Sequence, residues 1–208
     1  QWYHKAARLG DVNAQFALAV MLAKGRGVGR DYEAAANLFE LASRSGHADA
    51  HYNLALLYVN GTGRPTDMVK AAEHLKAAAE QDHAAAQYDL GGLYEMGHGV
   101  EHDDGLAAHW IRRAAYKGLA AAQLEFAIML YKGRGIIQDR KKAVWFLTAA
   151  AEKGNAVAQN RLARLYAYGE IVEANIIKAT KWHLLARDRG VSDFKLDQYI
   201  SRLTKNEL

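Results

Sequence analysis

The chain contains no cysteine and only one proline in 208 residues. The lack of cysteine excludes disulfide bonds and thiolate metal sites, but it suits the cytosol and a disulfide-free periplasmic protein equally. Because proline interrupts helices and occurs only at Pro65, long helices are permitted along nearly the whole chain. No apolar run approaches the roughly 20 residues of a membrane-spanning helix. Half of the residues are nevertheless apolar, which is enough to bury a continuous core.

The charge of the chain is nearly balanced, with 27 basic and 23 acidic residues and a net charge of +4. We expect this mild excess to be spread along the chain rather than gathered into the basic stripe that is typical of nucleic-acid-binding proteins. We therefore expect no nucleic-acid partner. No signal peptide is visible, but the sequence opens in the middle of a repeat and resembles a fragment, so this absence does not indicate a cytoplasmic location.

The strongest signal in the sequence is a repeat of 36 residues. Glutamine returns at one position in four repeats, and His51 takes its place in another. The three clearest columns are Gln15, Gln87, Gln123 and Gln159; Gly25, Gly61, Gly97, Gly133 and Gly169; and Ala35, Ala71, Ala107, Ala143 and Ala179. A fixed period of this length is typical of a solenoid. We predict one domain over 1–208, with a partial repeat over 1–10, five repeats over 11–190 and a C-terminal cap over 191–208.

Each repeat is predicted to be a helical hairpin. Ala122, Phe126, Met129 and Leu130 recur at the spacing of one helix face. The glycine column then closes the first helix, because glycine adopts the left-handed conformation without a Cβ penalty. A column of aspartate and asparagine stands where the second helix needs an N-cap. The predicted first helices are 12–24, 48–60, 84–96, 120–132 and 156–168, and the second helices are 31–45, 67–81, 103–117, 139–153 and 175–189.

The repeat is similar to that of a known family. The segment Ala86-Gln87-Tyr88-Asp89-Leu90-Gly91 is followed at fixed spacing by Tyr94, Gly97, Gly99 and Val100, and then by Asp103, Ala107, Trp110, Ala114 and Gly118. This pattern resembles the Sel1-like repeat, a relative of the tetratricopeptide repeat. The resemblance implies an all-α, right-handed α/α superhelix. It also implies a protein-binding adaptor or regulator that is not an enzyme and needs no cofactor or metal.

A narrower resemblance concerns compartment and partner. The cysteine-free repeats and the exit sequence Arg187-Asp188-Arg189-Gly190-Val191 are similar to the ExoR-type regulators, which are periplasmic Sel1-like proteins of alphaproteobacteria. This resemblance implies a periplasmic location. It also implies, as partner, the periplasmic domain of a sensor histidine kinase that controls exopolysaccharide synthesis.

Several motifs suggest chemistry but have simpler explanations. The Gly-x-Gly loops lack the preceding strand of a phosphate-binding site and recur in four repeats, which favours a repeat turn. Ser192 is expected to be the N-cap of the last helix rather than a nucleophile. His98 and His102 share a glycine loop, where their spacing does not place them on one helix face as metal ligands.

The nine histidines titrate near neutrality, but no pattern in their positions supports pH sensing. Three tryptophans share a core column, whereas Trp145 is offset and expected to be exposed.

The partner-binding surface is predicted from columns that vary between repeats. In related solenoids, the stripe beside the core of the first helices lines the concave face, and ordinary drift of a solvated face is the competing explanation. The predicted partner-binding residues are Asn53, Asn60, Asp89, Glu125, Arg161, Arg164 and Tyr168. Two alternatives remain open: a binder of cell-wall glycan or another polysaccharide, which would need exposed aromatics beside paired polar groups, and a hydrolase, which would need a nucleophile and base that we do not find.

Overall fold

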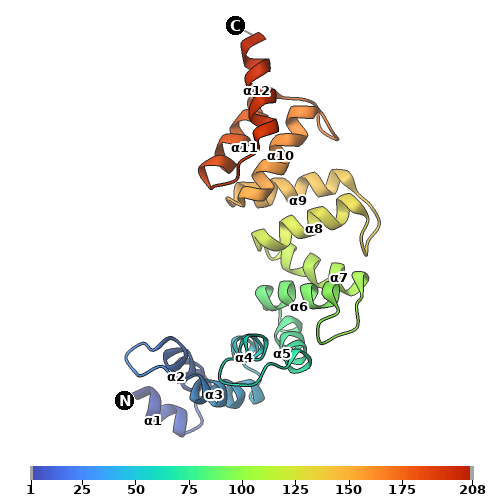
Figure 1. The fold of residues 1–208 in the computed structure, drawn as a ribbon. Coiled ribbons are helices and arrows are strands. Elements are labelled where there is room, and N and C mark those ends of the chain that lie inside the picture. The colour runs from blue at the N-terminus through green and yellow to red at the C-terminus, as the bar shows by residue number, and fades with distance from the viewer. Residues whose placement is uncertain (1, 207–208) are drawn as a thin grey trace. The chain divides into compact units, whose positions relative to one another are not determined.

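The computed structural model describes the backbone of residues 2–206 and the side chains of residues 2–202. Twelve α-helices and no strand occur between residues 2 and 206 (Figure 1). The helices are α1 (Trp2–Arg8), α2 (Val12–Lys24), α3 (Tyr32–Arg44), α4 (Ala48–Asn60), α5 (Met68–Glu80), α6 (Ala84–Met96), α7 (Asp104–Tyr116), α8 (Ala120–Lys132), α9 (Arg140–Glu152), α10 (Ala156–Tyr168), α11 (Ile176–Asp188) and α12 (Phe194–Asn206). The all-α prediction is confirmed. None of these helices is long and apolar enough to cross a membrane.

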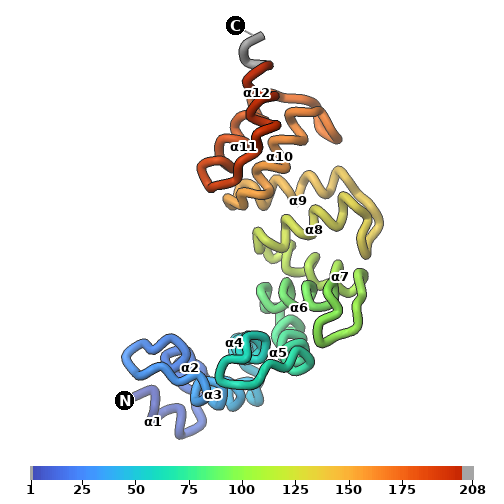
Figure 2. The backbone as a smooth tube through the Cα atoms, viewed as in Figure 1, coloured from blue at the N-terminus to red at the C-terminus, as the bar shows by residue number. Residues whose placement is uncertain are grey.

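The contacts divide the chain into two compact units, Gln1–Trp110 and Ile111–Leu208. Within the first unit, each helix from α1 to α5 packs against the next one along the chain. Within the second unit, α8 packs on α9, α9 on α10 and α10 on α11, and α12 contacts both α10 and α11. Figure 2 shows the hairpin path of one repeat, which runs along α8, turns and returns along α9.

Both predicted cap columns are confirmed. The glycines that follow the first helices have φ between 64° and 74°, which is the left-handed region. At the starts of the second helices, the side chains of Asp31, Asp67, Asp103, Asp139 and Asn175 each accept a hydrogen bond from a backbone N–H three residues on, at 2.9–3.0 Å. Local sequence therefore determines where the first helix of each repeat ends and where the second one begins.

The glutamine column joins neighbouring repeats. In all four cases the side-chain Nε2 donates to the carbonyl of an alanine eight residues earlier, at 3.0–3.3 Å. Gln87 and Gln159 are almost completely buried. A buried carbonyl without a partner is costly, so the glutamine satisfies the end of the preceding helix while filling the core.

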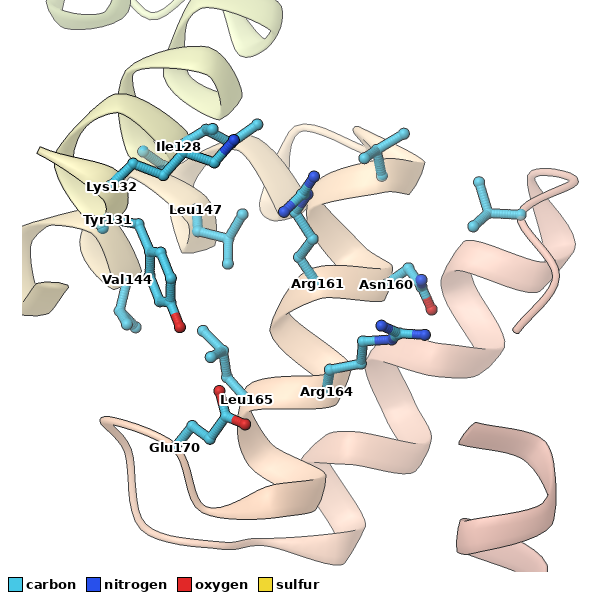
Figure 3. A pocket seen from close by; sticks show the side chains of 14 residues that line it. Ile128, Tyr131, Lys132, Val144, Leu147, Asn160, Arg161, Arg164, Leu165 and Glu170 are labelled. Carbon is cyan, nitrogen blue, oxygen red and sulfur yellow. The ribbon is translucent and has the colours of Figure 1, made fainter. Parts of the chain in front are cut away.

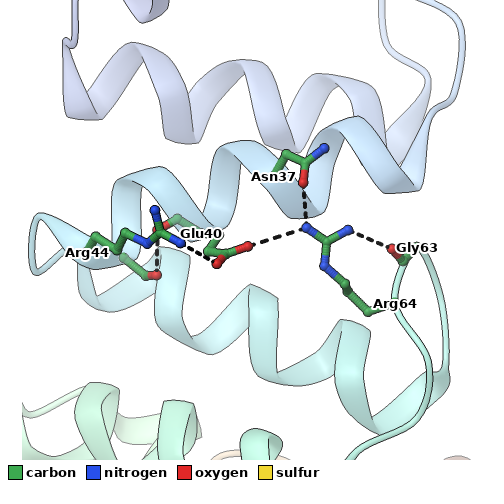
Figure 4. Close-up of polar contacts among 6 residues, drawn as sticks. Asn37, Glu40, Arg44, Gly63 and Arg64 are labelled. Carbon is green, nitrogen blue, oxygen red and sulfur yellow. Dashed lines mark hydrogen bonds and ion pairs between the residues drawn. The ribbon is translucent and has the colours of Figure 1, made fainter.

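The first unit also contains a polar clamp between repeats. Arg64, in the loop after α4, reaches back to α3 (Figure 4). Its guanidinium donates to Asn37 Oδ1 at 2.5 Å and lies 3.4 Å from Glu40 Oε2. Glu40 is also paired with Arg44 at 2.7 Å. A guanidinium has several N–H donors in one plane, so it can contact Asn37 and Glu40 at the same time.

The C-terminal helix buries Leu196 and Ile200 against α10 and α11. Its N-cap differs from the prediction, because the carboxylate of Asp193, and not Ser192, accepts from the backbone of Leu196 at 3.2 Å. Ser192 is exposed. Part of the predicted cap, residues 207–208, lies outside the described residues.

The tryptophans follow the prediction in part, because Trp182 of the core column is only half-buried. Trp110 is buried and Trp145 is 59% exposed, as expected from their columns. Trp2 shares the column of Trp110, but its side chain is 85% exposed. Column membership therefore predicts burial only where a neighbouring repeat packs against the ring.

Candidate partner-binding surface

A cavity of about 510 Å³ lies in the second unit, between α8, α9 and α10. We call it the α8–α10 groove. Its apolar wall consists of Ala127, Ile128, Ala143, Val144, Leu147, Val157, Leu165 and Val191. Its polar lining consists of Tyr131, Lys132, Asn160, Arg161, Arg164 and Glu170. A hollow that combines apolar surface with a few polar groups is the usual form of a binding site.

Some charged side chains of the groove have a partner within the protein, and others do not. Figure 3 shows Lys132 and Arg161 along one side of the cavity and Glu170 on the opposite side. In the part of the chain that the structure describes, the side chains of these three residues form no hydrogen bond or ion pair. Two cations beside apolar surface are therefore available to an incoming anionic group.

Arg164 is engaged within the protein. Its Nε donates to Asp193 Oδ2 at 2.6 Å, and Asn160 donates to the same oxygen at 3.2 Å. The hydrogen bond from Arg164 is the main cause that lowers the pKa of Asp193 to about 2. Because an arginine already paired in this way has less to offer a ligand, Arg164 supports the wall of the groove more than it presents a free charge.

Glu125 and Tyr168, two further predicted residues, do not line the groove. Glu125 is paired with Arg134 of the following loop at 2.6 Å. The ring of Tyr168 packs against that of Tyr199 on α12, with centroids 4.9 Å apart. Of the four residues predicted in this unit, the groove thus brings together Arg161 and Arg164.

The other three predicted residues lie in the first unit. Asn53 donates to the carbonyl of Asp49 at 2.7 Å, and Asn60 is exposed at the last turn of α4. Asp89 is half-buried, and burial raises the pKa of its carboxyl although a hydrogen bond from Tyr52 opposes the shift. Burial and the nearby Asp89 raise the pKa of Tyr52 to about 12. None of these three residues lines the α8–α10 groove.

The expectation of evenly spread charge is wrong. Residues 1–110 contain 9 basic and 14 acidic residues, a net charge of −5, whereas residues 111–208 contain 18 basic and 9 acidic residues, a net charge of +9. The two units therefore have net charges of opposite sign, although the total charge is nearly balanced. A count by half-chain would have revealed this. Lys132, which sequence reasoning left out of the site, shares its repeat column with the predicted residues Asn60 and Tyr168.

No group of three or more His, Asp or Glu side chains in the described part of the chain is arranged to hold a metal ion. His98 and His102 are exposed in the loop before α7, where His102 lies 3.7 Å from Asp104.

The sequence pattern of the Sel1 repeat matches six consecutive segments, residues 1–11, 12–47, 48–83, 84–119, 120–155 and 156–191. The chain belongs to the Sel1 repeat family. Members of this family generally act as protein-interaction adaptors, and their solenoid fold is typically a non-catalytic scaffold.

Solved structures agree with this assignment. A protective antigen of uropathogenic Escherichia coli strains, described as having an SLR fold, is 34% identical with a TM-score of 0.87, and the match covers 91% of this chain and 40% of that one. The chain thus spans well under half of that protein. A Sel1 repeat protein from Oxalobacter formigenes is 32% identical with a TM-score of 0.80, over 87% of this chain and 72% of that one.

A more distant structure shares the fold. An immunity protein from Pseudomonas aeruginosa is 24% identical with a TM-score of 0.52, over 84% of this chain and 64% of that one. No functionally curated protein sequence matches the chain.

Proposed function

We propose that this Sel1 repeat chain is a non-catalytic adaptor that binds a protein segment in the α8–α10 groove. The observation that carries the proposal is a pair of cations beside an apolar wall, Lys132 and Arg161, which have no partner among the described residues. Repeat solenoids commonly bind partners along such extended surfaces. The family's general role in protein interactions supports a protein as the occupant.

The groove fits a segment that carries an acidic side chain next to an apolar one. The carboxylate would bind Lys132 and Arg161, and the apolar side chain would pack against Val144 and Leu147. Arginine can bind a carboxylate through two parallel hydrogen bonds. The net charge of +9 on this unit would also raise the rate at which an acidic partner approaches.

The narrower proposal concerns compartment and partner. The resemblance to the ExoR-type regulators supports a periplasmic location and the periplasmic domain of a sensor histidine kinase as the partner. Fractionation of cells that express the parent protein from its own locus tests the compartment. Recovery with the cytoplasmic fraction would contradict this narrower proposal and leave the adaptor role intact.

A glycan-binding role is the second candidate, because one observation favours it. The side chain of Trp145 is 59% exposed on α9, and an exposed indole can stack on a sugar ring. Retention on insoluble peptidoglycan that is lost in Trp145→Ala, but kept when the groove charges are reversed, would favour the glycan over a protein partner.

The groove can be tested by site-specific cross-linking. A photoreactive benzoylphenylalanine at Val157, on the groove, should cross-link a partner in cell extract, whereas the same group at Ile177, which is 79% exposed outside the groove, should not. The cross-linked segment should contain adjacent acidic and apolar residues when it is mapped by mass spectrometry. A segment without acidic residues, or equal cross-linking at both positions, would contradict the proposal.

A further inference from the structure

Three histidines of the first unit stand in columns that other repeats fill with residues that do not titrate near neutrality. His47 and His83 occupy the N-cap column of the first helices, and His51 occupies the glutamine column. The second unit has Leu119 and Asn155 in the N-cap column. It has Gln123 and Gln159 in the glutamine column. Imidazoles therefore perform structural tasks in the first unit that Asn155, Gln123 and Gln159 perform in the second, whereas Leu119 forms no side-chain cap.

The two N-cap histidines accept hydrogen bonds from the backbone. Nδ1 of His47 accepts from the N–H of Ala50 at 3.2 Å, and Nδ1 of His83 accepts from the N–H of Ala86 at 3.0 Å. A ring nitrogen can accept only while it carries no proton. Protonation of either ring at Nδ1 therefore removes the cap and leaves a helix N–H without its partner.

The third histidine is part of a direct contact between two imidazoles. Nδ1 of His51 on α4 lies 2.9 Å from Nδ1 of His74 on α5. The carbonyl of Ser43 accepts a hydrogen bond from His51, as an alanine carbonyl does from each glutamine of this column. One Nδ1 must donate and the other must accept, so the contact cannot survive when both rings are protonated.

Neighbouring groups make protonation of this pair costly. Burial is the main cause that lowers the pKa of both His51 and His74. At His74 the charges of His51 and Lys70 lower the pKa further, whereas Glu73 and Glu40 oppose them. The ring of Tyr58 stacks on His74 with its centroid 5.8 Å away.

The N-cap histidines have different surroundings. His47 stacks on the ring of Phe16 at 4.4 Å. His83 stacks on Tyr52 at 4.5 Å, and its Nε2 lies 3.1 Å from Asp49 Oδ1. A neutral ring with its proton on Nε2 satisfies both contacts, because Nε2 can donate to Asp49 while Nδ1 accepts from Ala86. Burial raises the pKa of the nearby Asp89, so protonation of this carboxyl favours the folded state and opposes the effect of the histidines.

The buried histidine of the second unit has a different role. Nε2 of His183 lies 2.6 Å from Asp197 Oδ1, and the residue lies inside α11 rather than at an N-cap. The residues equivalent to His74 in this unit are Phe146 and Trp182, which do not titrate. The second unit therefore lacks both the histidine N-caps and the contact between two imidazoles that the first unit contains.

We propose that the first unit is an acid-sensitive segment: between pH 7 and pH 5 the packing of α4, α5 and α6 loosens, while α8, α9 and α10 stay intact. Repeats depend mainly on their neighbours, so one part of a solenoid can open before the rest. A histidine with a lowered pKa contributes stability that is complete above the ordinary value near 6.5 and is lost as the pH falls below it. Each additional proton bound on opening lowers the ratio of closed to open molecules by about tenfold per pH unit.

Hydrogen exchange of the whole chain at pH 7.0 and 5.5 tests this proposal, with exchange times corrected for the intrinsic rate and a chelator in every sample. Peptides from α4, α5 and α6 should lose at least tenfold in protection relative to peptides from α8, α9 and α10. Both units are measured in the same molecule, so an effect of acid on the whole chain cancels in the ratio of the two protection factors. Equal changes in both units would overturn the proposal.

A variant that copies residues from the second unit gives the matched control. His47→Asn, His83→Asn and His51→Gln introduce the residues found at Asn155 and Gln159. We expect this triple variant to resemble the wild type at pH 7.5 and to lose the difference in protection at pH 5.5. An unchanged difference would also overturn the proposal. If the variant does not fold, ring titration of the wild type by NMR decides, since pKa values at or above 6.5 for both His51 and His74 contradict the mechanism.

Discussion

Arg164 on α10 and Asp193 before α12 form an ion pair at 2.6 Å that connects the last Sel1 repeat to the C-terminal helix. The same carboxylate caps α12 through the N–H of Leu196. Asp193 is buried whereas Arg164 is about half exposed. The side chain of Asp193 therefore caps α12 and also connects this helix to the last repeat. This pairing also explains why Arg164, although it lines the groove, is a weaker candidate than Arg161 for holding a partner.

Two substitutions separate the roles of Asp193. Asn caps a helix about as well as Asp, so Asp193→Asn should keep the cap and lose only the charge pair, at a cost of about 0.5–1 kcal/mol because Arg164 is half exposed. Asp193→Ala should cost about 1 kcal/mol more, since it also removes the cap. Urea melts at pH 7 measure both. Equal losses in the two variants would contradict the assignment of Asp193 as the cap.

The charge pair has a defined pH window. Arg164 lowers the pKa of Asp193 to about 2, below the ordinary value of 3.8. A lowered carboxyl pKa stabilises the fold fully above the unfolded value, and this contribution is lost as the pH falls from about 4 to about 2. The free energy of unfolding of the wild type should therefore approach that of Asp193→Asn across this window. Parallel curves from pH 5 to pH 2 would argue against the pair.

Asp89 should behave in the opposite way. Burial raises the pKa of its carboxyl, so the folded state holds this proton more tightly than the unfolded state does. At pH 7 the ionised group therefore opposes folding. We expect Asp89→Asn to raise Tm at pH 7, because the amide oxygen can still accept from Tyr52. The gain should shrink as the pH falls through the folded pKa, and a loss of stability at pH 7 would show that the charge is satisfied.

Two glycines of one loop test how closely the repeats approach. Gly97 and Gly99 both have left-handed φ values, +67° and +71°. A Cβ on Gly97 would make ordinary contact with His102, so Gly97→Ala should cost about 1–2 kcal/mol from backbone strain. A Cβ on Gly99 would overlap the carbonyl group of Met68 in the preceding hairpin. Gly99→Ala should therefore be clearly the more damaging in urea melts, and equal losses would contradict the close approach.

The helices could be predicted from the sequence because the same boundary residues recur at the same position in successive repeats. The predicted first helices, such as 84–96 and 120–132, agree with α6 and α8 at both ends. The predicted second helices are one residue too long at each end, because they include the N-cap and the final turn residue; 139–153 compares with Arg140–Glu152. Ile171 shows the limit of the pattern, since it occupies a glycine column and still adopts φ of +68°.

The candidate site was less predictable. A helix phase shows which way a residue points, but not which side chain it meets. Arg164 meets Asp193, 29 residues away, and Glu125 meets Arg134 in a loop, so both lose the freedom that the stripe implied. The His51–His74 contact likewise joins two helices and leaves no local pattern. Such pairings depend on how helices and loops pack against one another. The residues of a single repeat column carry no information about that packing.

The most direct test of the adaptor proposal is the dissociation constant of the partner segment cross-linked at Val157. Lys132→Glu with Arg161→Glu should weaken binding at least tenfold at low salt, which is about 1.4 kcal/mol, with less effect at high salt. Lys141→Glu with Arg112→Glu changes the same charge at exposed positions of this unit outside the groove and should leave affinity within about threefold, or roughly 0.7 kcal/mol. Equal losses in the two variants, or unchanged affinity in the groove variant with its melting curve intact, would contradict the proposal that the α8–α10 groove binds the partner.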